Sequence, residues 1–338
     1  MKRASPAAPK GRTPLLRNRR GIVFLIIALL AIGIFLTILF SRTRPTETER
    51  AESIVARISS MDDFLKDFHA DVHRATYISG FRTLIALEEY INEKGSFLTN
   101  VSPKFIEAFL NGTIDGKSYD ILTNSTFSDY LGRVNEDAAK IGVALNVTIE
   151  AITLSQSTPW SVDVTFSLGV NVTDTRGLAR WDYVKPFTTE VSILDLRDPV
   201  YSVATYGRLP NTFRISPFNN TDFVKGNDTT NLSAEALQMY YREDPYAPSF
   251  LQRLNGSLNS SSKYGIASIV NLDEINAQGL AVYTTRSVID AVYFSGRNTT
   301  NYCPTNGSPR PSWLKIDSTH YNDPKHDYEI SKLNATTC

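Results

Sequence analysis

Residues 21–40 read GIVFLIIALLAIGIFLTILF, a run from Gly21 to Phe40 that contains no charge and no proline. As a helix rising 1.5 Å per residue, a run of this length spans about 30 Å, the thickness of the hydrocarbon core of a bilayer. A buried helix of a soluble protein rarely stays apolar on all faces for so long. A cleaved signal sequence usually has a shorter apolar core followed by small residues, whereas SRTRP follows here at 41–45. The run therefore predicts an uncleaved transmembrane helix.

The charges around this run are uneven. Residues 1–20 contain no acidic residue and seven basic ones, Lys2, Arg3, Lys10, Arg12, Arg17, Arg19 and Arg20. The positive-inside rule then places the N-terminus in the cytoplasm and the chain beyond residue 40 outside the cell. We expect residues 1–20 to be a disordered tail close to anionic lipid headgroups.

The long part after the tail is mildly acidic. The chain of 338 residues has 35 basic and 35 acidic residues, so that removing the seven basic residues of the tail leaves 28 basic residues against 35 acidic ones. Binding to nucleic acid requires a basic surface that neutralises phosphates. This composition argues against a nucleic-acid partner.

Acceptor triplets for N-glycosylation (Asn-X-Ser/Thr, X not proline) are enriched beyond the apolar run. With 22 Asn and 63 Ser or Thr residues, chance would give about four such triplets. Thirteen occur, all beyond residue 40, at Asn100, Asn111, Asn124, Asn146, Asn171, Asn219, Asn227, Asn231, Asn255, Asn259, Asn298, Asn306 and Asn334. Asn, Ser and Thr are also common turn residues, but that explains scatter better than enrichment on one side. The triplets and the charges agree on which side is outside.

The chain has two cysteines, Cys303 and Cys338. In a cytosolic protein they would be two separate thiols, but in an exported protein a disulfide is expected. In the loop-entropy model such a closure contributes roughly 3–4 kcal/mol.

Residues 47–95 are predicted to form an amphipathic helical stalk. Apolar residues recur along it at alternating steps of four and three, at Ile54, Ile58, Met61, Leu65, Phe68, Val72 and Ala75. This seam, about three heptads long, either mediates self-association or is covered by the protein's own domain. We favour coverage, because the seam is short and Ser79-Gly80 breaks the pattern.

Residues 96–338 are predicted to form an extracytoplasmic α+β domain. Strand-like alternation at 145–154, 162–172, 184–196 and 200–204 suits an antiparallel sheet with one face on a core. Helices are expected at 103–110, 126–143, 234–243, 250–255, 272–277 and 285–294, the second capped by Ser125 or Thr126. Residues 219–233 are predicted to be a loop, and the tail from residue 298 to be held by the cysteines.

Two sets of residues could carry metal or acid–base chemistry. His69 and His73 lie four residues apart on the predicted stalk helix, but Ala70 stands where the zinc-protease pattern has its Glu. The second set lies in the tail and comprises His320, His326, Asp317, Asp323 and Asp327. We interpret both sets as ordinary surface residues.

Other signatures of chemistry are missing from the sequence. No phosphate-binding glycine loop, Gly-x-Ser-x-Gly, Cys-x-x-Cys or Asp-x-Asp occurs. We therefore predict no enzyme activity, no cofactor and no metal site.

Five stretches, together with the layout, carry a resemblance to known proteins. They read TPW at 158–160, GLARW at 177–181, LRDPVY at 196–201, SIVNL at 268–272 and SWLKID at 312–317. On these stretches the chain resembles uncharacterised archaeal single-pass membrane proteins.

The N-terminal part resembles type IV pilin-like proteins, in which a basic leader precedes an apolar helix that continues into an amphipathic helix carrying a β-rich head. The junction Arg19-Arg20-Gly21 looks like the leader-processing site of archaeal members. Two features depart from the pattern: no Gln or Glu follows Gly21, and Ile26 stands where a pilin often carries Glu. Both removal of residues 1–20 and an unprocessed anchor fit the sequence.

We therefore expect a membrane-anchored, N-glycosylated structural or assembly protein of the cell surface, with a minor pilin-like subunit as its most specific form. Its partners would be the lipid bilayer and other copies of the 47–95 helix. A membrane-anchored binding or receptor ectodomain is the alternative, and an anchored extracytoplasmic enzyme is less favoured.

Overall fold

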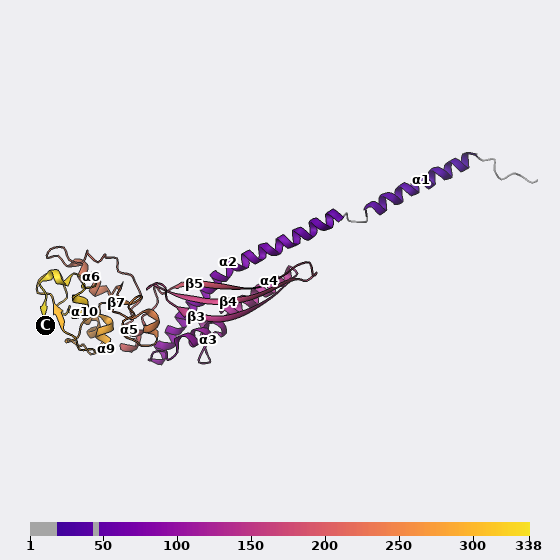
Figure 1. Cartoon of the computed structure of the whole chain (residues 1–338). Coiled ribbons are helices and arrows are strands. Elements are labelled where there is room, and N and C mark those ends of the chain that lie inside the picture. Colours follow the sequence, from indigo (N-terminus) through magenta and orange to yellow (C-terminus); the bar gives the residue numbers. More distant parts are fainter. Residues whose placement is uncertain (1–18, 43–46) are drawn as a thin grey trace, which may run out of the picture. The chain divides into compact units, whose positions relative to one another are not determined.

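The computed structural model describes residues 19–42 and 47–338 (Figure 1). The chain divides into two compact units, which meet in sequence between Asp62 and Asp63. The basic tail predicted for residues 1–20 lies outside the described residues except at Arg19 and Arg20, where the first helix begins. The described chain combines helices with antiparallel sheets, as the α+β prediction requires.

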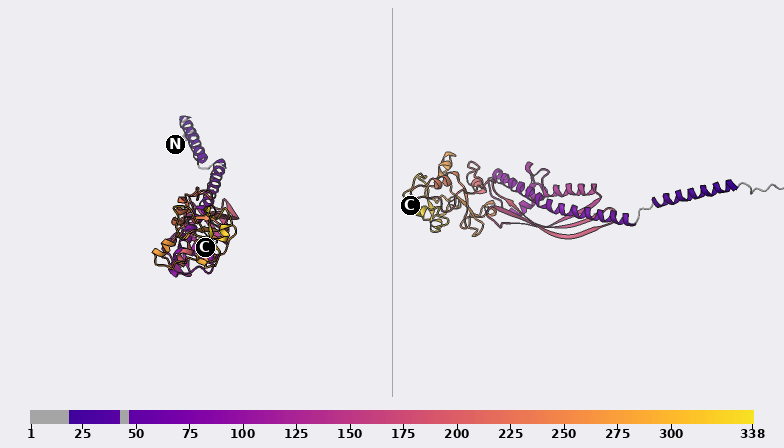
Figure 2. Two further views of the ribbon diagram at one scale, coloured as in Figure 1. Left: turned by 90° about the vertical axis from the view of Figure 1, so that its left-hand side faces the viewer. Right: turned by 90° about the horizontal axis from the view of Figure 1, so that it is seen from above.

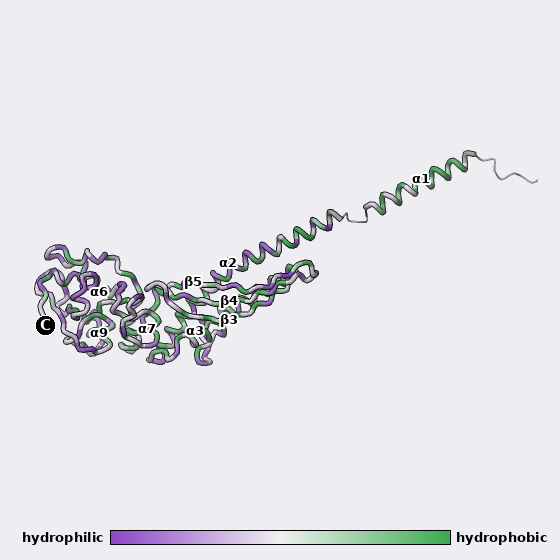
Figure 3. Tube along the Cα trace, viewed as in Figure 1, coloured by the Kyte–Doolittle hydropathy of each residue, from purple (hydrophilic) through white to green (hydrophobic). Residues whose placement is uncertain are grey.

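Helix α1 (Arg19–Arg42) contains the predicted apolar run. Its segment Gly21–Ser41 is 21 residues long, has a mean hydropathy of 3.2, and is long and apolar enough to cross a membrane (Figure 3). The hydroxyl of Thr37 donates hydrogen bonds to the carbonyls of Gly33 and Ile34, at 3.0 and 2.8 Å. A helix that satisfies its polar groups internally in this way suits an environment without water.

Helix α2 (Glu47–Lys94) follows the predicted 47–95 stalk closely and has 48 residues. In the second unit its seam is covered, since Leu65, Phe68, Val72 and Ala75 expose 5, 3, 0 and 9% of their surface. Coverage of this part of the seam by the protein's own domain is therefore confirmed. In the first unit Ile54 and Ile58 remain 40 and 37% exposed.

The apolar pattern of the seam breaks at Ser79-Gly80, while α2 continues through these residues, as the stalk predicted over 47–95 requires. Gly80 marks a close approach of the helix to the sheet. A Cβ atom at Gly80 would lie 3.0 Å from Cγ2 of Val191, tighter than nearly all real contacts. The lack of a side chain, rather than helix termination, explains this glycine.

The main sheet is an antiparallel meander of three long strands, β3 (Val143–Ser155), β4 (Ser161–Asp174) and β5 (Arg180–Ser192). The three strands predicted near these positions are confirmed. Alternate side chains of β4 expose at most 1% of their surface: Val162, Val164, Phe166, Leu168, Val170 and Val172. The opposite face is polar, as the hydrogen bond of 3.0 Å between the hydroxyls of Thr165 and Thr188 illustrates. The period of two thus separates a core face from a solvent face.

Helices α2, α3 (Val101–Asn111) and α4 (Phe127–Lys140) cover the apolar face of this sheet (Figure 2). Aromatic rings join the layers, since the Phe127 ring lies 5.1 Å from both the Phe109 and the Phe166 ring. A small hairpin, β1 (Thr113–Ile114) and β2 (Lys117–Ser118), and a 3-10 turn, Asp120–Leu122, connect α3 to α4.

The predicted cap of α4 is confirmed at Thr126. Its hydroxyl accepts from the backbone NH of Asp129 at 3.0 Å, and the Asp129 carboxylate accepts from the backbone NH of Thr126 at 3.0 Å. The predicted extension of this helix to residue 143 is wrong. Gly142 turns into the left-handed region with φ of 70°, and Val143 already begins β3.

Residues 193–338 form a lobe of short elements joined by ordered loops. Its helices are α5 (Pro199–Ala204), α6 (Thr230–Gln238), α7 (Phe250–Leu254), α8 (Leu272–Ala277), α9 (Asp290–Ser295) and α10 (Ser318–Tyr321), with a 3-10 turn at Ile330–Leu333. Its strands are β6 (Tyr241–Glu243), β7 (Ile266–Ser268), β8 (Asn301–Cys303), β9 (Ile316–Asp317) and β10 (Thr336–Thr337). The helices predicted at 250–255 and 272–277 are confirmed.

The strand predicted at 200–204 is wrong, because these residues form helix α5. Pro199 occupies the first turn, and the Asp198 carboxylate accepts from the backbone NH of Val200 at 2.8 Å. Cap and proline together initiate a helix in spite of the β-branched residues.

The helix predicted at 234–243 is also partly wrong. α6 ends at Gln238, Met239 turns left-handed with φ of 52°, and 241–243 pair with β7 instead. α6 begins at Thr230, inside the predicted loop 219–233. Helix α9 begins only at Asp290, because Ile289 still pairs with Ile269 in a β-bridge.

Candidate functional site

The two histidines on α2 contact different residues of β5. Nε2 of His69 lies 2.8 Å from the Tyr183 hydroxyl, and its Nδ1 lies 3.1 Å from Nζ of Lys185. His73 Nδ1 lies 3.1 Å from the Thr189 hydroxyl. Burial, reinforced by the positive charge of Lys185, lowers the pKa of His69. Both imidazoles therefore fasten α2 to β5 rather than share a ligand.

The tail set divides into separate groups in the structure. His320 lies between two carboxylates, with Nδ1 2.7 Å from Asp317 Oδ2 and Nε2 3.0 Å from Asp244 Oδ2. His326 pairs with Asp323 at 2.9 Å. Asp327 precedes the following 3-10 turn and accepts from the backbone NH of Glu329 at 2.9 Å. Among residues 19–42 and 47–338, no three His, Cys, Asp or Glu side chains form a group that could hold a metal ion.

His320 is a charged group inside the lobe and exposes 2% of its surface. Burial by itself would lower its pKa, but the carboxylates of Asp244 and Asp317 outweigh burial and raise the pKa of His320 to about 10. The interpretation of this residue as a surface histidine is therefore wrong. Asp244 lies 76 positions before His320 in the sequence, and no local pattern signals the pairing. With both nitrogens beside carboxylates and no access to solvent, His320 holds chain segments together.

A second buried ionic group joins three helices of the lobe. Arg253 of α7 is 0% exposed and pairs with Asp198 at 2.5 Å and with Asp290 at 2.9 Å. The Tyr241 hydroxyl donates to Asp198 at 2.7 Å, and the Ser268 hydroxyl donates to Asp290 at 3.1 Å. Burial raises the pKa of Asp290, against the opposing effect of Arg253.

This group, which we call the Arg253 cluster (Asp198, Tyr241, Arg253, Ser268 and Asp290), links α5, β6, α7, β7 and α9. No pattern in the sequence indicates this cluster, because its members are spread over residues 198–290 and follow no periodicity. A buried arginine with two carboxylate partners satisfies its charge internally and offers no surface to a substrate.

Two further carboxyl groups have strongly perturbed environments. Burial raises the pKa of Glu88 on α2 well above its usual value. Burial also raises the pKa of Glu235 on α6 to about 7, although its hydrogen bond from the Ser216 hydroxyl opposes this. They lie on different helices in different halves of the unit, so they do not form an acid–base pair.

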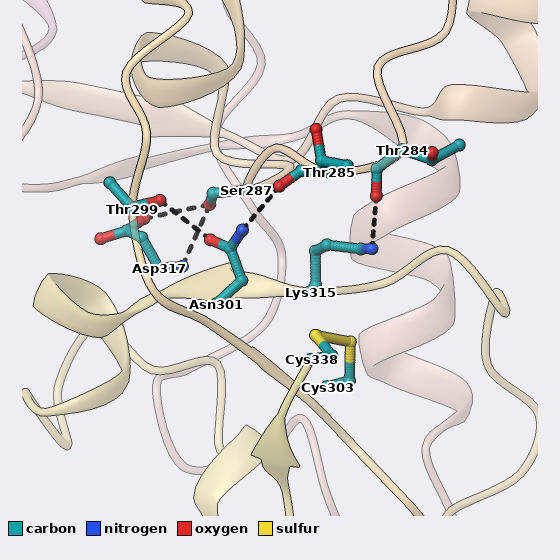
Figure 4. Close-up of a disulfide and its surroundings, with 9 residues drawn as sticks. All are labelled: Thr284, Thr285, Ser287, Thr299, Asn301, Cys303, Lys315, Asp317 and Cys338. Carbon is teal, nitrogen blue, oxygen red and sulfur yellow. Dashed lines mark hydrogen bonds between the residues drawn. A yellow bond between two sulfur atoms is a disulfide. The ribbon is translucent and has the colours of Figure 1, made fainter.

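The predicted disulfide between Cys303 and Cys338 is confirmed, with a Cα–Cα distance of 5.8 Å (Figure 4). It joins β8 to the end of the tail, where β10 pairs with β8. Around it, Asn301 donates to the Thr285 carbonyl at 2.9 Å and Lys315 donates to the Thr284 carbonyl at 2.6 Å. The cysteines thus hold the C-terminal strand, as the sequence predicted.

The thirteen acceptor asparagines all lie at the surface. Eleven are exposed, and Asn171 and Asn231 are half-buried. The three buried asparagines among the described residues, Asn211, Asn271 and Asn301, lie outside the triplets. Asn146 and Asn171 are directly opposite each other in the β3–β4 ladder, on the solvent face of the sheet. Every acceptor is therefore placed where a glycan could be attached without unfolding a core.

Comparison with known proteins gives no further guidance: no protein-family model, no curated protein and no solved structure matches this chain.

Proposed function

We propose that this chain is a membrane-anchored, N-glycosylated structural or assembly protein that faces the outside of the cell, built in the manner of a minor pilin-like subunit. Helix α1 would be the single anchor, with the N-terminus in the cytoplasm and residues 47–338 outside. The length and apolar composition of Gly21–Ser41 support the anchor. The surface position of all thirteen acceptor asparagines supports an exported, glycosylated head.

The observation that carries the assembly role is the uneven coverage of the α2 seam. From Met61 onward its apolar positions are buried, whereas Ile54 and Ile58 expose 40 and 37% of their surface, and Val55 beside them exposes 65%. Exposed apolar residues clustered on one helix indicate an interaction surface. A helix with an open apolar seam of this kind suits packing against the same helix of a second copy.

The proposal assigns no catalytic activity to the chain. The two charged clusters of the lobe, around His320 and around Arg253, are closed to solvent. Their charged side chains pair with one another, which suits a structural role.

Site-directed disulfide cross-linking tests the assembly role. Both native cysteines are bridged, so a single introduced cysteine reports on its own surroundings. We expect Ile58→Cys, on the seam, to form covalent dimers in the native membrane. Ser60→Cys is the matched control, because Ser60 is exposed on the opposite side of the same helix. Equal cross-linking at both positions, or none at Ile58→Cys, would contradict assembly through α2.

Analysis of the N-terminal peptide of protein from its native membrane tests the pilin-like form of the proposal. A mature chain beginning at Gly21 or Ile22 would support leader removal before assembly. A chain that retains residues 1–20 would overturn the pilin-like form and leave a permanent single-pass anchor.

A further inference from the structure

A basic groove lies between α2 and α4, on the second unit alone. It has a volume of 420 Å³ and is lined by Arg74 and Arg82 from α2, by Arg133 and Tyr130 from α4, and by Asn124 from the turn before α4. Ala75 and Ile78 add apolar surface to its wall. None of these residues takes part in the His320 or Arg253 clusters.

The groove has more positive than negative charge. Its one carboxylate, Asp71, pairs with Arg74 at 2.9 Å. Arg133 donates to the backbone carbonyl of Asn124 at 3.1 Å, a neutral partner. Arg82 is exposed, and none of the ion pairs of the described chain involves it. Two guanidinium groups thus face the groove without a carboxylate, and guanidinium groups bind planar oxyanions through paired hydrogen bonds.

A tyrosine in the wall of the groove has a hydroxyl without a partner. The Tyr130 hydroxyl oxygen is shielded from solvent and has no hydrogen-bond partner within the described residues. A buried polar atom left without a partner is costly, and native structures rarely keep one without a reason. Because the oxygen is shielded, a ligand in the groove reaches this hydroxyl only when the Tyr130 side chain turns toward it.

The rim of the groove is formed by an acceptor asparagine. Asn124 is exposed, belongs to the triplet Asn124-Ser125-Thr126, and has a left-handed backbone with φ of 55°. A sugar attached there would begin at the edge of the groove. Such a sugar would meet both the apolar wall at Ala75 and Ile78 and the two guanidinium groups that have no carboxylate partner.

We propose that this groove binds a carboxylate-bearing sugar, with Arg82 and Arg133 on the carboxylate and the Tyr130 hydroxyl donating to a sugar oxygen. The sugar could be part of the glycan on Asn124 or part of a separate acidic polysaccharide. Only the first source rests on the glycosylation in the proposed function. The second would make the head a binding module, beyond an assembly role.

The binding arm of the test uses the full chain in detergent, produced without glycans, and titrates it with an oligogalacturonate by calorimetry. A neutral oligoglucose of equal length is the control ligand. We expect binding of the acidic probe only, weakened at least about tenfold in Arg82→Gln/Arg133→Gln, because charge-assisted pairs dominate such recognition. The matched variant Arg176→Gln/Arg208→Gln removes two exposed arginines elsewhere and should bind as the parent does.

The variant Tyr130→Phe separates binding from folding. Because the hydroxyl has no partner within the described chain, its removal should leave the melting temperature unchanged or slightly higher. It should weaken probe binding about threefold or more, the effect of one lost hydrogen bond. No binding of the acidic probe by the parent, or equal binding by the Arg82/Arg133 variant, would overturn the proposal.

The source arm uses protein from the native membrane and compares Asn124→Gly with Asn334→Gly. Both asparagines belong to acceptor triplets and have positive φ, of 55 and 49°, so glycine fits both backbones. If probe binding rises only in Asn124→Gly, the ligand of the groove is the glycan attached to Asn124. If probe binding is equal in both variants, the ligand of the groove is a separate acidic polysaccharide. If mass spectrometry finds no glycan at Asn124, the proposed glycosylation is wrong at that residue. The titration with the acidic probe then decides by itself whether the groove binds a carboxylate-bearing sugar.

Discussion

Residues 63–192 and residues 193–338 belong to one compact unit but are held together by different interactions. The first region is a sheet under three helices, joined by rings such as Phe109, Phe127 and Phe166. The second has short elements joined by buried charges and one disulfide. Apolar packing tolerates gradual change, whereas a buried charge must keep its partner or lose several kcal/mol. The stability of the lobe should therefore depend mainly on keeping its buried charges paired. The stability of the sheet layer should depend mainly on the volume of its side chains.

The largest effect is expected when the Arg253 cluster loses its cation. Arg253→Met leaves the carboxylates of Asp198 and Asp290 buried without a counter-charge, which should cost about 5 kcal/mol, the upper end for a broken buried ion pair. Urea unfolding of the full chain measures this loss. Arg208→Met, at an exposed arginine, is the control and should change stability by less than about 0.5 kcal/mol. A small loss of stability in Arg253→Met would contradict the idea that buried charges hold the lobe together.

Opening the disulfide should have the next largest effect. Cys303 and Cys338 close a loop with a sequence separation of 35, for which loop entropy predicts roughly 3–4 kcal/mol. The double variant Cys303→Ser/Cys338→Ser should lower stability by that amount. Amide hydrogen exchange should then increase in β8 and β10 and stay unchanged in β3–β5. Equal increases in both regions would show that the unit unfolds without a boundary between them.

Reducing the volume of a side chain in the sheet layer should lower the free energy of unfolding by a smaller amount. Phe166 is 1% exposed and contacts the rings of Phe127 and Phe187. Phe166→Leu keeps the site apolar and should cost about 1–2 kcal/mol by urea unfolding. Thr165→Ser, one residue away on the solvent face, is the control and should be nearly neutral. A cost above that of Arg253→Met would reverse the proposed order of the two regions.

The smallest effect, counted per pH unit, concerns His320. Its folded pKa of about 10 lies above the ordinary value of 6.5, so the folded chain keeps a proton that the unfolded chain releases. This stability is complete below pH 6.5 and should fall by roughly 1 kcal/mol per unit as the pH rises toward 10. Unfolding at several pH values should show this slope in the parent chain and in His326→Asn, but not in His320→Asn. A flat profile in the parent would exclude a charged His320.

Much of the sheet layer could be predicted from the sequence, because its side chains follow the period of a strand. In β4, every second residue from Val162 to Val172 faces the core, and that alternation is visible in the sequence. Thr126 likewise has a local partner, Asp129, three residues away. At Gly80 the sequence shows only a break in the apolar pattern, and the close approach of α2 to Val191 that explains the glycine is visible only in the structure.

The lobe could be predicted only in part, because its contacts join distant residues. Residues 200–204 have strand propensity, but the side chain of Asp198 and the ring of Pro199 initiate a helix there. Tyr241 joins β6 because it pairs with Ser268 across the β6–β7 ladder. The sequence marks the tail histidines as possible ligands, but no spacing indicates Asp244, the partner that gives His320 its structural role.

The strand register that places Asn146 opposite Asn171 would govern how uniformly the protein is glycosylated. Side chains directly opposite in an antiparallel ladder have Cβ atoms about 5 Å apart, less than the width of an oligosaccharide. Once one of the two asparagines is glycosylated, the transferase that modifies the other would have to reach it beneath the first chain of sugars. Purified molecules should then separate by mass into singly modified forms, with the doubly modified form rarer than two independent sites would give. Heterogeneity of this kind would arise from the pairing of two strands, although each triplet by itself is an ordinary acceptor.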